Sequence, residues 1–129
     1  MTSEILTHVE EFFGDAVQKF DIHASGFEYL IELQEKLREG PMITFRRLYG
    51  GEWRVEDIRE VLRLGLIGGG KTPADAHKLV VRYFERSPLA DHAALALSVM
   101  SAAIVGRKSE DEPAPTAREA VAVITGEAA

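Results

Sequence analysis

Residues 55–71 read VEDIREVLRLGLIGGGK, and the rest of the chain is organised around this stretch. Apolar residues recur in it at spacings of three and four, with charged residues in the turns between, at Val55, Ile58, Leu62 and Leu66. This period predicts an amphipathic helix in which Ile58 and Leu62 are buried. The glycines at 68–70 should end the helix, because glycine adds backbone entropy and packs no side chain.

The end of the same stretch, from Gly65 to Thr72, also satisfies the phosphate-loop pattern of glycine, four residues and Gly-Lys-Thr. A working loop of this kind follows a buried strand and directs helix amides at phosphate. The residues before Gly65 have a helical period and frequent charges, so they do not form a buried parallel strand. We therefore expect Lys71 to be solvated, and a nucleotide-binding enzyme is the weaker alternative.

The composition limits the classes of function. A chain of 129 residues is most simply one domain, and its formal net charge of -6 argues against binding nucleic acid by neutralising phosphates. A helical DNA-binding regulator acting through residues 46–63 is disfavoured, because acids and bases balance at seven each between Glu32 and Arg63. The chain has no cysteine, an acidic N-terminus unlike a secretory signal and no apolar run near the length of a membrane span. We expect a soluble cytoplasmic protein.

The first elements of the chain predict a hairpin followed by helices. Aromatic and β-branched residues flank Gly14-Asp15 within residues 7–22, which indicates a β-hairpin that must lie on helices or on another chain. Ser25 with Glu28 has the form of a capping box, and the helix it opens should end before Gly40-Pro41. A short second helix should then span residues 42–49.

Two further helices should follow the triple glycine. Thr72-Pro73 is a typical helix start for a segment reaching Arg86, and residues 89–105 have helical spacing. The expected fold class is therefore mainly α (α+β), with an N-terminal β-hairpin packed on a compact bundle of about five helices. Residues 1–106 should form this single domain.

Residues 107–129 are expected to be a linker and a flexible tail. The first part is polar, acidic and contains proline. Residues 116–124 have the pattern of a short helix with one apolar side, but a helix of this length is unstable alone. It should be disordered, or become ordered on a partner or a neighbouring subunit.

No constellation of side chains predicts catalysis, a cofactor or a metal site. The histidines His8, His23, His77 and His92 each read as surface or turn residues. The candidates for partner binding are Trp53, Arg46, Arg47 and Tyr49. Arg46 and Arg47, with Arg54, form a small basic cluster that is either a solvated face or a site for an acidic partner segment. Trp53 more readily covers the joint between two helices.

Taken together, these features resemble a known family. The order of elements is an N-terminal hairpin, the Gly26–Leu37 helix, a short helix, the segment 55–70 and a Thr-Pro-Ala-Asp helix. The most specific element is the series Asp57-Ile58, Val61-Leu62, Gly65-Leu66 and Gly68–Gly70. This series resembles the small tail proteins of bacterial gene transfer agents and their prophage relatives, over about residues 7–106. The family is described both as phage tail tube protein and as tail assembly chaperone.

The resemblance implies a non-enzymatic protein of tail morphogenesis. A chaperone of this kind would cover apolar stretches of the tape-measure protein or bind the tail tube protein in the cytoplasm. A structural tail tube subunit, residing in the virion tail, is the alternative, although tube rings are generally built from sheets. Either role could involve a homo-oligomer, and neither implies nucleic acid, a membrane or a cofactor.

Overall fold

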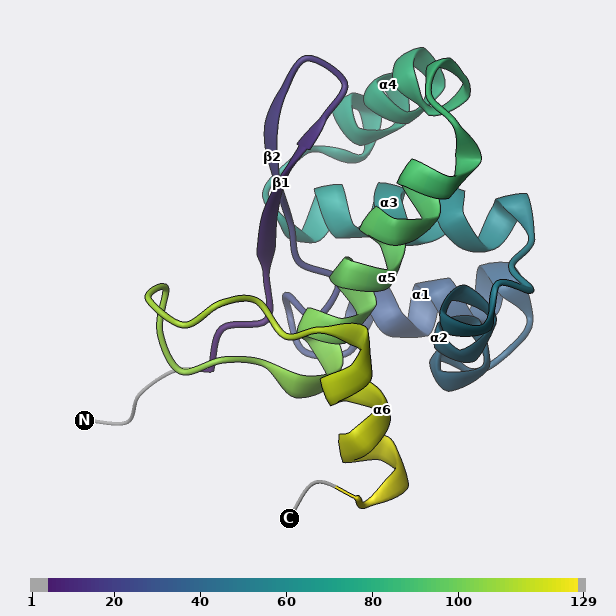
Figure 1. Cartoon of the computed structure of the whole chain (residues 1–129). Helices are drawn as coiled ribbons and strands as arrows, with labels where there is room; N and C mark the ends of the chain where they lie inside the picture. The colour runs from purple at the N-terminus through teal and green to yellow at the C-terminus, as the bar shows by residue number, and fades with distance from the viewer. Residues whose placement is uncertain (1–4, 128–129) are drawn as a thin grey trace.

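The computed structural model describes residues 5–127, which form six α-helices and one antiparallel hairpin (Figure 1). In chain order these are β1 (Val9–Phe13), β2 (Ala16–Phe20), α1 (Glu28–Leu37), α2 (Pro41–Gly50), α3 (Val55–Gly68), α4 (Pro73–Tyr83), α5 (Leu89–Val105) and α6 (Ala117–Thr125). A 3-10 turn at Phe84–Arg86 links α4 to α5. The prediction of a mainly helical fold with an N-terminal hairpin is confirmed.

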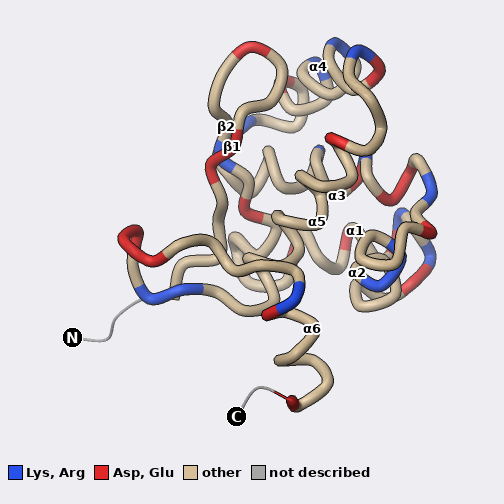
Figure 2. Tube along the Cα trace, in the orientation of Figure 1, with Lys and Arg blue, Asp and Glu red and all other residues tan. Residues whose placement is uncertain are grey.

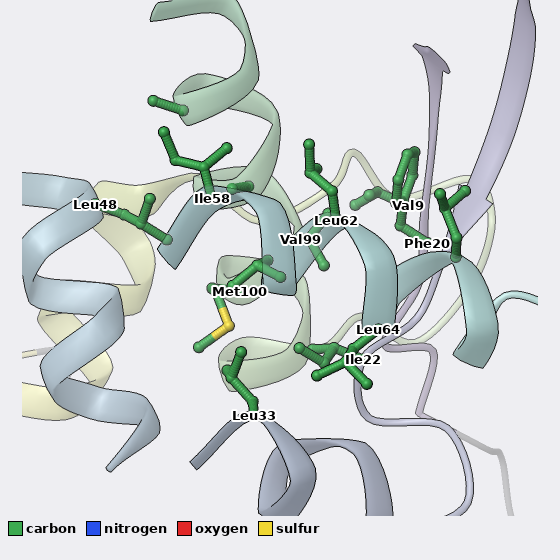
Figure 3. Close-up of a cluster of buried hydrophobic side chains, with 14 of the residues drawn as sticks. Val9, Phe20, Ile22, Leu33, Leu48, Ile58, Leu62, Leu64, Val99 and Met100 are labelled. Atoms are coloured by element: carbon green, nitrogen blue, oxygen red, sulfur yellow. The ribbon is translucent and has the colours of Figure 1, made fainter. Parts of the chain in front are cut away.

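α3 lies at the centre of the fold, and β2, α1, α4 and α5 all pack against it. Its Ile58 and Leu62 have no exposed surface, as the sequence predicts. Figure 3 shows these side chains beside Val99 and Met100 of α5, with Leu33 of α1 nearby. Full burial of an aliphatic side chain contributes roughly 1.5–3 kcal/mol, so this shared face supplies much of the stability of the fold.

The hairpin turns at Gly14-Asp15, as the sequence predicts, and pairs Val9 with Phe20 and Phe13 with Ala16. The rings of Phe13 and Phe20 meet edge to face, with their centroids 6.1 Å apart. β2 packs along α3 and β1 along α5, so the hairpin lies at one side of the bundle (Figure 1). This packing supplies the support that two strands lack on their own.

The glycines at the end of α3 allow β2 to approach it closely. A Cβ atom at Gly68 would lie 1.7 Å from the carbonyl oxygen of Asp21, and one at Gly69 would lie 2.0 Å from that of Lys19. The N–H of Asp21 donates to the carbonyl of Gly65 at 2.9 Å. α3 does end at Gly68, but close backbone contact with the hairpin is a second reason for glycine here.

The capping signals at two helix starts have opposite outcomes. Thr72 caps α4 as predicted, because its Oγ1 accepts the N–H of Asp75 at 3.1 Å. The capping box predicted at Ser25 is wrong: α1 begins at Glu28, its N-cap is Phe27, and no side chain caps it. Ser25 has φ of 58°, in the left-handed region, whereas a capping residue needs an extended backbone.

The segment after α5 contacts the body of the protein at two places. Leu6 and Arg107 exchange two backbone hydrogen bonds, of 2.7 and 2.9 Å. The short helix expected near residues 116–124 is present as α6, and it packs on α5 of its own chain with Ala120 fully buried. The domain boundary at residue 106 and the flexibility of the segment up to residue 127 stay predictions. Residues 128–129 of the predicted tail lie outside the described residues.

Candidate interaction surface

Two arginines of the predicted basic cluster hold helices together. Arg47 of α2 forms a bidentate pair with Glu39, and its Nη1 lies 3.9 Å from Oδ1 of Asp57. Arg54 donates from Nη2 to Oδ1 of Asp57 at 2.8 Å and from its backbone N–H to Oδ2 at 2.8 Å. The hydrogen bond from Arg47 lowers the pKa of Glu39, and the bond to Asp57 raises the pKa of Arg54. These contacts tie the end of α1 and the body of α2 to the start of α3.

The other candidate residues lie on or next to the exposed side of α2. Arg46 is exposed, and Tyr49 is 50% exposed while its ring stacks on Phe45 at 6.2 Å. Met42, four residues before Arg46, shares their face of the helix. Trp53 is half-buried against the core just after α2. Partner binding by Trp53 and by the α2 residues, including Arg47, stays a prediction.

An apolar groove lies between the first half of α1 and the start of α2. It has a volume of about 350 Å³ and is lined by Phe27, Leu30, Ile31, Gln34, Pro41 and Met42. We call it the α1–α2 groove. Phe27 is 63% exposed and Ile31 52% exposed, and because both line one groove they form an apolar patch rather than scattered single residues. Since Met42 also belongs to the Arg46 face, the groove continues into the exposed side of α2.

The groove arises because α1 carries more apolar surface than its neighbours cover. Leu33 and Leu37 are buried, and Leu30 is half-buried beside them. Phe27 and Ile31, four residues apart, form a second stripe turned away from the core. All five of these residues are visible in the sequence as apolar positions of one helix. They cover more of the helix surface than a single stripe, and this spread is the signal in the sequence that the helix has a second apolar face.

Charged residues border the α1–α2 groove. Glu28 and Glu35 are exposed and seven residues apart, so helical spacing places both on the solvent side of Ile31. Arg46 lies one turn beyond Met42 on α2. An amphipathic helix with an apolar stripe and flanking charges of both signs would match this arrangement.

The phosphate-loop pattern does not have the geometry of a nucleotide site. The amides of Gly69, Gly70 and Lys71 donate to carbonyls of the last turn of α3, at 2.8, 3.0 and 3.0 Å. The backbone carbonyls of Asp21, just after β2, and of Lys19 occupy the space beside Gly68 and Gly69, and the segment before these glycines is helical. Lys71 is exposed, as predicted. These residues therefore do not fit a bound phosphate.

A depression of about 460 Å³ lies between α1, α3 and α4 and is lined mainly by charged residues. Three of its lining charges pair: Arg63 contacts Glu60 at 2.7 Å and Arg59 contacts Glu60 at 3.8 Å, and Arg63 also contacts Glu32 of α1 at 3.1 Å. A ligand there would have to replace these pairs. Among the described residues, no three His, Cys, Asp or Glu side chains are grouped to hold a metal ion.

Two histidines are buried, which corrects the prediction that all four lie at the surface or in turns. His92 is 5% exposed, and its ring lies 5.8 Å from that of Phe13 and 5.0 Å from that of Phe84. Burial lowers the pKa of His92. His8 is 6% exposed, with Nε2 3.0 Å from Oε1 of Glu110. The buried face of α5 includes His92 together with Ala96 and Val99, at helical spacings of four and three.

A family model described as "Phage tail tube protein, GTA-gp10" matches residues 7–106. The chain belongs to this family of phage tail proteins. No curated protein and no solved structure matches the chain.

Membership of the phage tail tube protein, GTA-gp10 family confirms the resemblance drawn from the sequence. The matched residues run from just before β1 to just after α5, so the hairpin and the α1–α2 groove both lie inside the family region. α6 lies outside it. The family indicates a role in phage-like tails and contacts with other tail proteins. Within the part of the chain that the structure describes, no helix has the length and apolar character needed to cross a membrane.

Proposed function

We propose that this chain is a non-enzymatic tail assembly chaperone that binds an amphipathic helix of the tape-measure or tail tube protein in the α1–α2 groove. The observation that carries the proposal is the groove itself: exposed Phe27 and Ile31 on a chain of the tail protein family. Exposed apolar surface of this kind favours association, because water leaves it when a partner binds.

The dimensions of the groove support a helix as the occupant. Phe27 and Gln34 are seven residues apart, which is about 10 Å at 1.5 Å per residue. That length equals two helical turns, the spacing of the i and i+7 anchors with which a helix binds in a groove. The bordering acids and Arg46 would orient the helix through its own charges.

Co-purification with the tape-measure protein and, separately, the tail tube protein from the same gene cluster tests this role. Ile31→Asp should abolish capture, because it places a charge at the centre of the apolar contact. Val81→Asp on α4 is the matched control, since Val81 is 65% exposed but lies outside the groove. Thermal melting should show that both variants are folded. Equal capture by the two variants would exclude the groove as the binding site.

A structural tail tube subunit is the second candidate, favoured by the description of the family. A chaperone acts in the cytoplasm during assembly and leaves, whereas a tube subunit stays in the particle. Mass spectrometry of purified particles separates the two. Many copies per particle would replace the chaperone proposal by the structural one.

The non-enzymatic part of the proposal has its own test. Thermal melting with and without magnesium and ATP should give the same midpoint. A nucleotide at 100 times its dissociation constant would add about 2.7 kcal/mol to stability. A rise of that size would reinstate the phosphate-loop hypothesis.

A further inference from the structure

β1 has an open hydrogen-bonding edge. In an antiparallel pair, opposed residues alternately exchange both backbone hydrogen bonds or neither. The backbone groups of Lys19 and Asp21 face the end of α3, so these residues occupy positions that make no hydrogen bonds across the hairpin. Glu10 is opposite Lys19 in the register, and Phe12 is two residues further along β1. The backbone groups of Glu10 and Phe12 therefore point away from β2. Within residues 5–127, neither of the two has a backbone hydrogen bond outside the hairpin.

A groove runs beside this edge, between β1 and α5. Its volume is about 250 Å³, and its lining residues are Glu11, Phe12, Asp91, Ala94, Leu95 and Ser98. The four residues from α5 recur at spacings of three and four, so they form one stripe of that helix. Ala94 is small and exposed, which leaves room for the side chains of an added strand. We call this site the β1–α5 groove.

The charge around the β1–α5 groove is mainly negative. Glu10, Glu11 and Asp91 are exposed, and none of them forms an ion pair among the described residues. Figure 2 shows acidic positions on the hairpin, next to an α5 that carries almost no charge. Lys19, opposite Glu10 on β2, is the basic residue of the two strands.

We propose that the β1–α5 groove binds an extended, basic segment of a partner protein, which adds to β1 as a third strand. The open amides and carbonyls of Glu10 and Phe12 would provide main-chain hydrogen bonds at the usual strand spacing of about 4.8 Å. Alternate side chains of the added strand would enter the groove over Ala94. Lysine or arginine side chains would meet the unpaired acids.

A second copy of the chain is the less suitable occupant. Antiparallel pairing of two β1 strands would bring Glu10 and Glu11 of one copy close to those of the other. Like charges in such positions are destabilising, and charged edge strands are a common protection against self-association. The proposal does not depend on the α1–α2 groove, which is on different helices.

A blocked synthetic peptide of alternating lysine and valine is the probe, and the glutamate–valine peptide is its control. Titration of the full chain by fluorescence anisotropy should show salt-sensitive binding of the basic peptide alone. Ala94→Arg should weaken this binding about tenfold or more, because it fills the groove and repels lysine. Ala74→Arg, at an exposed alanine of α4, should leave it unchanged. Ile31→Asp should also bind normally, which separates this proposal from the chaperone proposal.

Amide hydrogen exchange gives a residue-level readout of the same titration. Bound peptide should slow exchange at Glu10 and Phe12, while the Glu11 amide, which already faces β2, should change little. Unchanged exchange at Glu10 and Phe12, or equal binding to the Ala94→Arg variant, would overturn the proposal. A dimer in light scattering that Ala94→Arg dissociates would overturn it too, in favour of a second copy as the occupant.

Discussion

Replacing Gly68 by alanine tests whether close backbone packing, rather than phosphate binding, requires the glycines after α3. The new Cβ would start 1.7 Å from the carbonyl oxygen of Asp21. Ordinary carbon–oxygen contacts begin near about 3.3 Å, so the two segments must separate by roughly 1.5 Å. A backbone carbonyl has no rotamer by which to move aside. The strain must therefore shift the hairpin on α3.

The size of the effect follows from what that shift disturbs. Loss of the bond between the Asp21 N–H and the Gly65 carbonyl costs about 1 kcal/mol. Displacing the fully buried neighbours Phe20 and Ile22 adds the ~1–3 kcal/mol that is typical of overpacking. The better helix propensity of alanine returns up to about 1 kcal/mol. We expect a net loss of about 1–3 kcal/mol.

Urea unfolding followed by the fluorescence of Trp53, the only tryptophan, measures this loss. With a slope of about 2 kcal/mol per M, the midpoint of Gly68→Ala should fall by about 1 M. Gly50→Ala is the matched control, because it also lies at the end of a helix and its added Cβ would meet nothing within 4 Å. That variant should be as stable as the natural chain or slightly more stable. A Gly68→Ala protein of undiminished stability would refute the reasoning.

Two further predictions concern the core. Leu62→Ala should lower the free energy of unfolding by ~2–5 kcal/mol, because Leu62 is fully buried. Val81→Ala, at an exposed site, should change it by less than about 0.5 kcal/mol. The urea unfolding midpoints of the two variants test both values. The lowered pKa of His92 means that the unfolded chain takes up this proton more readily, so stability should fall as pH drops below about 6.5. Midpoints of the natural chain and His92→Phe between about pH 7.5 and about 5.5 test this, and parallel pH profiles would show that His92 is not the cause.

The candidate surface shows the limit of prediction from the sequence. Arg46 and Tyr49, which the sequence predicts to face a partner, are both exposed on α2, and their role in binding stays a prediction. Arg47 was predicted with them, but Glu39 and Asp57 engage it, and both approach it only through tertiary packing. Phe27 and Ile31 were visible as apolar positions, but their exposure depends on which faces of α1 the neighbouring helices cover.

Local physics explains what the sequence by itself determined. The spacing of Ile58, Leu62 and Leu66 requires a helix with one buried face, and the Gly14-Asp15 pair between apolar segments requires a hairpin. The cap at Thr72 acts within one turn, so it too is encoded locally. These signals involve residues that are neighbours along the chain.

The tertiary structure decided the features that join distant residues. The docking of β2 against Gly68, the burial of His92 between two aromatic rings and the packing of α6 on α5 all depend on the relative placement of separate elements. No local pattern reports such placement, because a side chain is buried or exposed according to the surface that the rest of the fold brings to it. The open edge of β1 arises in the same way. The end of α3 covers the outer backbone edge of β2, whereas the outer backbone edge of β1 has no hydrogen-bonding partner among the described residues.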